Sequence, residues 1–148
     1  MKKVGRKVNL LAPDGFVRRI GEGSFIRLND NSILFAFTEF SGGREDEDIA
    51  RISCISSSDE GESRSEKKVL FEKAENDVNI MSFSFLRMEN GDIGAFYIVK
   101  SKDRSDTIVM RRSSDEGKTW SEPQNCLSDL EKPDYFILNN DRVVRLKN

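Results

Sequence analysis

The side chains that could carry chemistry in this sequence are carboxylates and arginines, because the chain has no histidine and only two cysteines. Triads and metal centres that depend on an imidazole are therefore excluded. The densest group of carboxylates lies in SGGREDEDIA at residues 41–50, where Asp46 is the first candidate acid and Asp48 the second. Clustered carboxylates raise one another's pKa, as a general acid requires, and Gly42-Gly43 would let the loop fold over a ligand. The alternative interpretation is a solvated acidic loop.

The elements that must position this loop are repeated along the chain. Residues 24–37 read SFIRLNDNSILFAF and residues 84–97 read SFLRMENGDIGAFY, an ungapped match at an offset of 60. Each segment is typical of a hairpin, because an alternating apolar run meets a turn pair and a second apolar run follows. The turn pairs are Asp30-Asn31 and Asn90-Gly91, and the second is the dipeptide of a type I′ turn.

Two further strands are predicted in each unit. The segments 49–56 and 107–113 run directly into the acidic turns SSDEGESR and SSDEGKTW. An apolar VLFE segment at 69–72 follows the first turn, and the weaker PQNCL at 123–127 follows the second. We therefore predict four antiparallel strands per roughly 58 residues, which is typical of a propeller blade. A helix over 62–77 is the alternative there, although the segment lacks a sustained apolar stripe at helical spacing.

A third unit begins near the end of the sequence. Residues 143–148, VVRLKN, repeat the start of the first two hairpins. We predict an all-β fold, a partial six-bladed β-propeller with blades over about 17–75 and 78–130 and the start of a third at 139–148. Because six such blades need roughly 350 residues, we expect residues 1–148 to form an incomplete propeller domain.

The acidic turns have a local physical purpose. In each, an aspartate can accept hydrogen bonds across the turn, a glycine supplies a positive φ, and hydroxyls close further bonds. The second turn forms a complete Asp-box from Ser113, Asp115, Gly117, Thr119 and Trp120. The first is a degenerate copy, with Ser57, Asp59, Gly61 and Ser63, and Arg64 in place of tryptophan. From about residue 17 onward, these motifs and the hairpin repeat resemble the sialidase (neuraminidase) superfamily, whose Asp-boxes are structural BNR repeats.

The resemblance implies roles for individual residues. Sialidases hold the substrate carboxylate with three arginines, because a guanidinium matches a carboxylate bidentately, and they use an aspartate as general acid. It implies that Arg19 binds the carboxylate, although Gly21 replaces the family's proline, and that Asp46 or Asp48 is the acid. Arg142 stands before the third unit as Arg19 stands before the first, which implies a second such arginine, oriented by Asn140 and Asp141. The alternatives are a surface arginine at 19 and a salt-bridged loop arginine at 142.

Other residues of the family pattern have no match in this sequence. The third arginine, the glutamate and the nucleophilic tyrosine are implied to belong to later blades. Tyr97 and Tyr135 do not match the nucleophile and are predicted to be packing or surface residues. Arg27 and Arg87 recur in step with the blade and are predicted to be structural, and Arg111-Arg112 beside the second acidic turn are predicted to be solvated at a strand edge.

Composition bounds the partners and the function. A net charge of −2 predicts no nucleic-acid partner, and the lack of an apolar run near the ~20 residues of a membrane span predicts no membrane. The start MKKVGRKVNLLAPDGF lacks the apolar core of a signal peptide, which predicts a cytoplasmic location. Cys54 and Cys126 are predicted to be free thiols, and no cofactor or metal is expected. The resemblance implies the N-terminal portion of an exo-glycosidase that hydrolyses a terminal acidic sugar, sialic acid, from glycoconjugates, and that is inactive as this chain alone. The alternatives are a non-catalytic module that binds glycan or protein as a homo-oligomer and an inert fragment.

Overall fold

The computed structural model describes residues 5, 11–103, 106–128 and 136–147 of the chain. Two four-stranded antiparallel sheets follow one another along the sequence, each with its strands in sequence order. The first contains β1 (Arg19–Arg27), β2 (Ile33–Phe40), β3 (Ala50–Ser57) and β4 (Lys68–Phe71). The second contains β5 (Asp77–Arg87), β6 (Ile93–Ser101), β7 (Thr107–Ser113) and β8 (Gln124–Asn125). The predicted all-β fold is confirmed, and the two sheets are consistent with part of a propeller.

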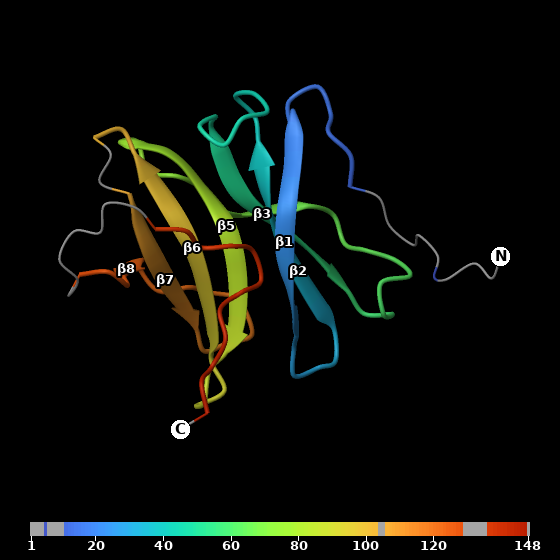
Figure 1. Cartoon of the computed structure of the whole chain (residues 1–148). Coiled ribbons are helices and arrows are strands. Elements are labelled where there is room, and N and C mark those ends of the chain that lie inside the picture. The colour runs from blue at the N-terminus through green and yellow to red at the C-terminus, as the bar shows by residue number, and fades with distance from the viewer. Residues whose placement is uncertain (1–4, 6–10, 104–105, 129–135, 148) are drawn as a thin grey trace.

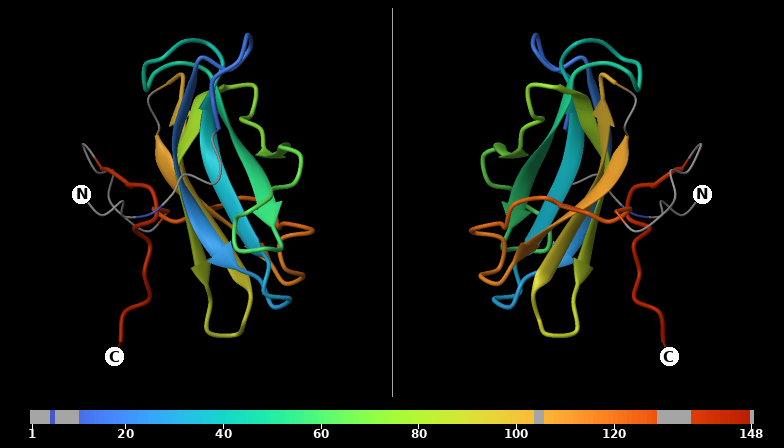
Figure 2. Two further views of the ribbon diagram at one scale, coloured as in Figure 1. Left: turned by 90° about the vertical axis from the view of Figure 1, so that its right-hand side faces the viewer. Right: turned by 90° about the vertical axis from the view of Figure 1, so that its left-hand side faces the viewer.

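The two sheets pack face to face, with the first strands β1 and β5 adjacent (Figures 1 and 2). The core between them is built from alternate residues of each strand, as expected when one face of a sheet is buried. Phe83 and Ala95 of the second sheet are 0% exposed, as is Ala36 of the first. The other buried residues of this core are Ile26, Leu34, Ile52, Phe71, Ile80, Phe85, Ile93, Tyr97 and Val109.

The hairpins form where the repeat predicts them, but the predicted type I′ turn is wrong. Met88 N–H bonds to the Asp92 carbonyl, and Gly91 N–H bonds to the Met88 carbonyl. The loop therefore has three residues, of which Gly91 alone has a positive φ, 91°. This is the three-residue hairpin that ends in a left-handed residue. Asn31, with φ 68°, takes the same place in the first hairpin, because asparagine tolerates this conformation better than most residues.

The two acidic turns have nearly identical hydrogen bonds. In the second, Asp115 Oδ1 accepts the Ser113 hydroxyl at 2.8 Å and the Thr119 N–H at 2.9 Å, while Oδ2 accepts the Thr119 hydroxyl at 2.6 Å. The first turn repeats these bonds at the same distances with Ser57, Asp59 and Ser63. The glycines at 61 and 117 have φ of 88° and 81°. Each turn thus ends one strand and begins the next section of chain through its own bonds.

Three segments outside the hairpins can be compared with the sequence predictions. The alternative helix over 62–77 is wrong, because this stretch contains β4. The weak segment after the second acidic turn forms only the two-residue strand β8. Residues 143–147 form no strand, and Val144 and Leu146 are 69% and 80% exposed (Figure 2). An extended segment is part of a sheet only when a neighbouring strand pairs with its backbone N–H and C=O groups. Asn148 lies outside the described residues.

Two predictions for single side chains also meet the structure. Tyr97 is a packing residue, 2% exposed, whereas Tyr135 lies outside the described residues. Arg111 is not a solvated edge residue: its Nε donates to the Tyr97 hydroxyl at 2.9 Å, and its guanidinium lies 5.1 Å from the centre of the Phe71 ring. Arg112 is half-exposed and forms an ion pair with Asp92.

The recurring arginines connect hairpins to acidic turns. Arg87 forms a two-pronged ion pair with Glu116, at 2.6 and 3.0 Å, and donates to the Gly91 carbonyl of its own hairpin. Glu116 also accepts the backbone N–H of Asn29 at 2.9 Å, in the hairpin of the first sheet. Arg27 pairs with Glu60 in the equivalent way. These arginines therefore hold hairpins and acidic turns together, and the Arg87–Glu116 pair also joins the two sheets.

Candidate functional site

The candidate site lies at the end of the sheets opposite the hairpin turns. Figure 1 shows the β2–β3 loop at the upper end and the hairpin turns at the lower end. Arg19 begins β1, and Phe40, its cross-strand neighbour, ends β2. The acidic loop, residues 41–49, follows directly, so the predicted arginine and the predicted acids come to one end of one sheet.

Arg19 and Asp46 form an ion pair. Arg19 Nη2 donates to Asp46 Oδ1 at 2.5 Å, and the Arg19 guanidinium lies 3.7 Å from the centre of the Phe40 ring. Phe40 is 1% exposed, whereas the Asp46 side chain is 60% exposed. A stacked guanidinium over a buried ring has a fixed position. The arginine is therefore the rigid partner of this pair, and the aspartate is the partner that can move.

The acidic loop separates its two candidate acids. Asp48 Oδ2 accepts the N–H of Glu45 at 2.8 Å inside the loop. A Cβ added to Gly43 would lie 2.2 Å from the same oxygen, and one added to Gly42 would lie 2.9 Å from the Ile49 nitrogen. The two glycines are thus needed for the loop to close on itself. Asp48 is used to hold the loop, and Asp46 alone of the pair reaches Arg19.

The second sheet anchors the same loop. Asn79, 0% exposed at the start of β5, donates from Nδ2 to the carbonyl oxygens of Asp46 and Asp48, both at 2.8 Å. Lys100 of β6 donates to the Asp46 carbonyl at 3.2 Å and to Glu47 Oε1 at 2.6 Å. The sequence analysis missed Asn79, although it stands 60 positions after Arg19, the offset of the hairpin repeat.

Residues 139–142 lie against β5 and its bulge. Asn140 Oδ1 accepts the N–H of Phe83 at 3.0 Å, and its Nδ2 donates to Glu22 Oε2 at 3.0 Å. Asp141 N–H donates to the Phe83 carbonyl at 3.1 Å, and its carboxylate accepts the Ser24 hydroxyl at 2.6 Å. These two side chains fix the backbone of the segment to both sheets.

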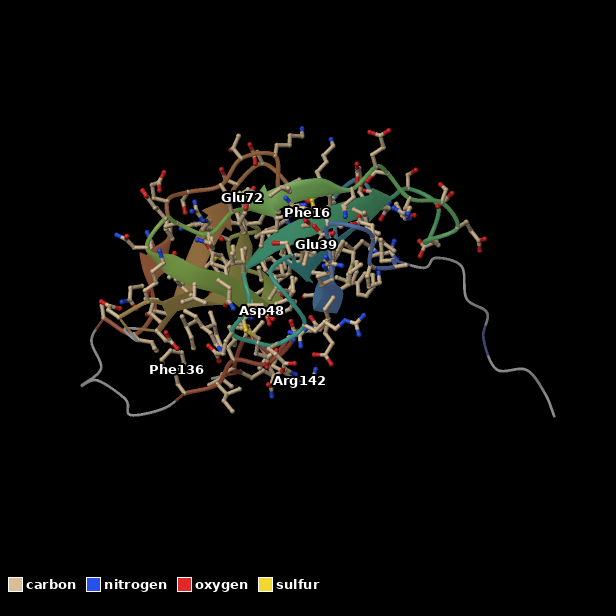
Figure 3. All side chains as sticks on the ribbon, turned by 90° about the horizontal axis from the view of Figure 1, so that it is seen from above. Phe16, Glu39, Asp48, Glu72, Phe136 and Arg142 are labelled. Carbon is tan, nitrogen blue, oxygen red and sulfur yellow. The ribbon has the colours of Figure 1, made fainter. Side chains whose placement is uncertain are left out.

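Arg142 does not line the same cavity as Arg19. Its backbone N–H donates to the Ser84 hydroxyl at 3.1 Å, and its guanidinium contacts the carbonyl of Asp141 at 3.2 Å. That Asn140 and Asp141 orient Arg142 stays a prediction: the Asp141 carbonyl contacts the guanidinium, while the side chains of both neighbours bond to other groups. Figure 3 shows the side chains of Arg142 and Asp48, both labelled, in a view from above.

Two neighbouring cavities divide the predicted residues. A cavity of about 380 Å³ is lined by Arg19, Asp46 and Asn140 together with Gly21, Thr38, Phe40 and Met81, among others. A second, of about 520 Å³, is lined by Arg142 with Glu22, Gly23, Asn139, Asn140 and Asp141. The structure thus brings three predicted site residues together around the first, which we call the Arg19 cavity, and places Arg142 at the next one.

A buried carboxylate lies on the far face of the first sheet. The Glu39 side chain is 0% exposed and accepts from Ser53 at 2.7 Å and from Lys67 and Arg51 (Figure 3). Burial acts to raise the pKa of Glu39, but the bonds from Lys67 and Ser53 outweigh it and hold the pKa below its ordinary value. Because every oxygen is paired, this cluster is a structural ion-pair network and no ligand site.

Other groups that could react are few within the described ranges. Cys54 and Cys126 are free, and burial raises the pKa of both thiols. No group of three or more potential metal ligands occurs among the residues the structure describes. The described residues also contain no helix with the length and apolar character of a membrane span.

Comparison with known proteins gives a fold likeness. No protein-family model matches the sequence, and no curated protein matches it. Among solved structures, the chain is similar to the "Hadza microbial sialidase Hz136", with a TM-score of 0.62 and 15% sequence identity. The likeness covers 72% of this chain and 25% of that one, so this chain spans about a quarter of that sialidase. The chain therefore has a sialidase-like β-sheet fold.

Proposed function

We propose that this chain is the N-terminal portion of a sialidase-like exo-glycosidase that hydrolyses a terminal acidic sugar, sialic acid, from glycoconjugates. The observation that carries the proposal is the Arg19 cavity, where a ring-stacked arginine, an exposed aspartate and an amide meet at one end of a sialidase-like fold. Fold alone does not decide function, so the proposal depends on these side chains.

Arg19 supplies the carboxylate-binding group. Its Nη2 atom donates a hydrogen bond to Asp46 Oδ1, and a ligand carboxylate would replace Asp46 as the acceptor. A guanidinium can donate two parallel N–H groups to one carboxylate. Asp46 accepts only one such bond from Arg19, so it does not use the full binding capacity of the guanidinium. The sugar acid would thus take the place of Asp46 on Arg19, while Asn140 contributes a further polar group at the cavity wall.

Asp46 supplies the acid. Once the ligand carboxylate occupies Arg19, the Asp46 side chain is released from the guanidinium and can face the glycosidic oxygen. A protonated carboxyl at this position can give its proton to the glycosidic oxygen as the bond from the anomeric carbon to that oxygen breaks. The nucleophile that bonds to the anomeric carbon in its place would come from a later blade. Asn79 and Lys100 hold the backbone of Asp46, so the side chain moves while the loop stays in place.

Binding and turnover test the proposal separately. We expect this chain to bind N-acetylneuraminic acid, measured by ligand-detected NMR, and to bind its methyl ester at least tenfold more weakly, because the ester lacks the charge that Arg19 pairs with. Arg19→Gln should remove the difference. Equal binding of acid and ester by the unmodified chain would refute the role of Arg19. Hydrolysis of a fluorogenic sialoside by this chain alone should be undetectable, and turnover that Asp46→Asn abolishes would overturn that expectation.

A second candidate function is a non-catalytic binding module that associates with copies of itself. An exposed aromatic surface on the first sheet favours it. Phe25 is 64% exposed and stacks on Phe35 at 4.2 Å, on the face of the first sheet away from the second. Its counterpart 60 residues later, Phe85, is 5% exposed because the first sheet covers it. Light scattering after size exclusion tests this candidate: a defined oligomer that Phe25→Ser dissociates supports it, and a monomer argues against it.

A further inference from the structure

The floor of the Arg19 cavity holds polar atoms that the fold does not use. Among the described residues, three buried side-chain atoms have no hydrogen-bond partner: Arg19 Nε, Thr38 Oγ1 and Asn79 Oδ1. Buried polar groups in proteins are nearly always paired, and each unpaired one reduces stability, so an exception calls for an explanation. Arg19 and Thr38 line the same cavity, and Thr38 is only 2% exposed.

A β-bulge creates the space at these atoms. The register of β1 against β2 shifts between Ile20 and Gly23, so that Gly21 and Glu22 together lie opposite Thr38. A Cβ added to Gly21 would lie 3.3 Å from the Thr38 Cβ and 3.5 Å from the Phe40 ring. Any larger side chain at 21 would therefore fill the floor beside Thr38. Bulges of this kind are common next to active sites, where they redirect side chains.

We infer that Thr38 is a further ligand-binding residue of the Arg19 cavity, whose hydroxyl and the Nε–H of Arg19 together hold one carboxylate oxygen of the acidic sugar. The inference rests on the proposed function. Nε and Nη2 form one side of the guanidinium fork, and Asp46 occupies only Nη2. When the ligand displaces the exposed Asp46 carboxylate, this side becomes available, and the Thr38 hydroxyl can donate a charge-assisted bond to the same anion.

The substitution Thr38→Val tests this, because valine keeps the shape and removes only the hydroxyl. We expect N-acetylneuraminic acid to bind about tenfold to a hundredfold more weakly, the range for one hydrogen bond to a charged group. We also expect Tm to rise by a few degrees, because the free protein loses an unsatisfied buried group. Weaker binding with higher stability is a combination that a purely structural threonine would not give. Thr107→Val, the same change on a strand outside the cavity, serves as the control for binding and should leave the Kd unchanged; its hydroxyl donates to Asn125 Oδ1 at 2.6 Å, so its Tm should not rise.

The outcomes separate this inference from the proposed function. If the unmodified chain binds the acid, Arg19→Gln abolishes binding and Thr38→Val binds within twofold of the unmodified chain, the inference is wrong and the proposed function stands. A lower Tm for Thr38→Val would also contradict the inference, because it would show that the hydroxyl already stabilises the fold. If the unmodified chain binds no acidic sugar, the proposed function fails and the inference fails with it.

Discussion

A single buried hydroxyl, that of Ser24, connects the two sheets and the segment 139–142. Its Oγ accepts the Phe85 N–H at 2.9 Å and donates to the Asp141 carboxylate at 2.6 Å, and Ser24 is 0% exposed. Ser24→Ala would leave the N–H of Phe85, itself 5% exposed, without a partner. An unpaired buried N–H costs about 1–3 kcal/mol. The lost bond to Asp141 adds less than about 1 kcal/mol, because that carboxylate can bind water instead.

The expected loss is therefore about 2–3 kcal/mol in the free energy of unfolding. Urea unfolding followed by the fluorescence of Trp120 measures it, because this side chain packs on Phe71 and Phe85 in the core between the sheets. With an unfolding slope of about 2 kcal/mol per M, the midpoint should fall by about 1 M or more. The slope itself should not change, since the same surface becomes exposed on unfolding.

Two other serines make the comparison specific. Ser84→Ala removes the bonds to Arg142 N–H and the Asn139 carbonyl and leaves the bond between the sheets intact, so its cost should be smaller, about 1 kcal/mol. Ser58 is an exposed serine of the first acidic turn, and Ser58→Ala should change stability by less than about 0.5 kcal/mol. The reasoning is refuted if Ser24→Ala costs no more than Ser58→Ala.

Three further predictions concern the second acidic turn. Hydrogen bonds from Thr119 lower the pKa of Asp115 to about 2, so the stabilisation of the fold by the ionised carboxylate is fully present above about pH 4 and is lost as pH falls toward 2. Asp115→Asn should therefore reduce the change of Tm between pH 4 and pH 2, and the same change of Tm in the variant would contradict this. Glu116→Gln breaks the ion pair with Arg87 and should cost about 1 kcal/mol, less in high salt; a double-mutant cycle with Arg87→Gln should show coupling, and additivity would rule it out. Gly117→Ala should cost about 1–2 kcal/mol by thermal unfolding, because φ is 81° and the new Cβ would lie 3.3 Å from Leu34; an unchanged Tm would disprove it.

The fold was predictable because its information is local. Strand alternation, a turn and an acidic motif occur within a few residues of one another, and they recur at an offset of 60, so one unit supports the interpretation of the next. Details that depend on a partner strand were not predictable. The strand-like sequence at 143–147 pairs with nothing in the described part of the chain, and β8 is shorter than its counterpart β4. The hairpin turn type was also missed, because Asn-Gly fits both a two-residue and a three-residue loop.

The candidate site was predictable in position and less so in orientation. The strand order alone brings Arg19 and the acidic loop to one end of the sheet, and the structure adds their contact. Nothing in the sequence says that Asp48 folds back over Gly43 or that Arg142 and Arg19 line different cavities. Thr38 and Glu39 are adjacent and lie on opposite faces of β2, yet both are buried. β2 is a central strand that lies between β1 and β3, and the burial of both its faces cannot be inferred from its own sequence.

The repeat itself separates residues that hold the fold from residues that form the site. Ser24 and Ser84 recur in register: Ser24 of β1 bonds to Phe85 of β5, and Ser84 of β5 bonds to Arg142 of the segment that follows the second sheet. Arg19 and Asn79 also lie 60 positions apart, but they differ in residue type. Both contact Asp46: Arg19 donates to the Asp46 carboxylate, and Asn79 donates to the Asp46 carbonyl. The residues that the two units share form bonds that maintain the fold, either within an acidic turn or between neighbouring chain segments. Where the units diverge, at the starts of β1 and β5, the first supplies the positive charge of Arg19 and the second supplies Asn79, which fixes the loop that carries Asp46.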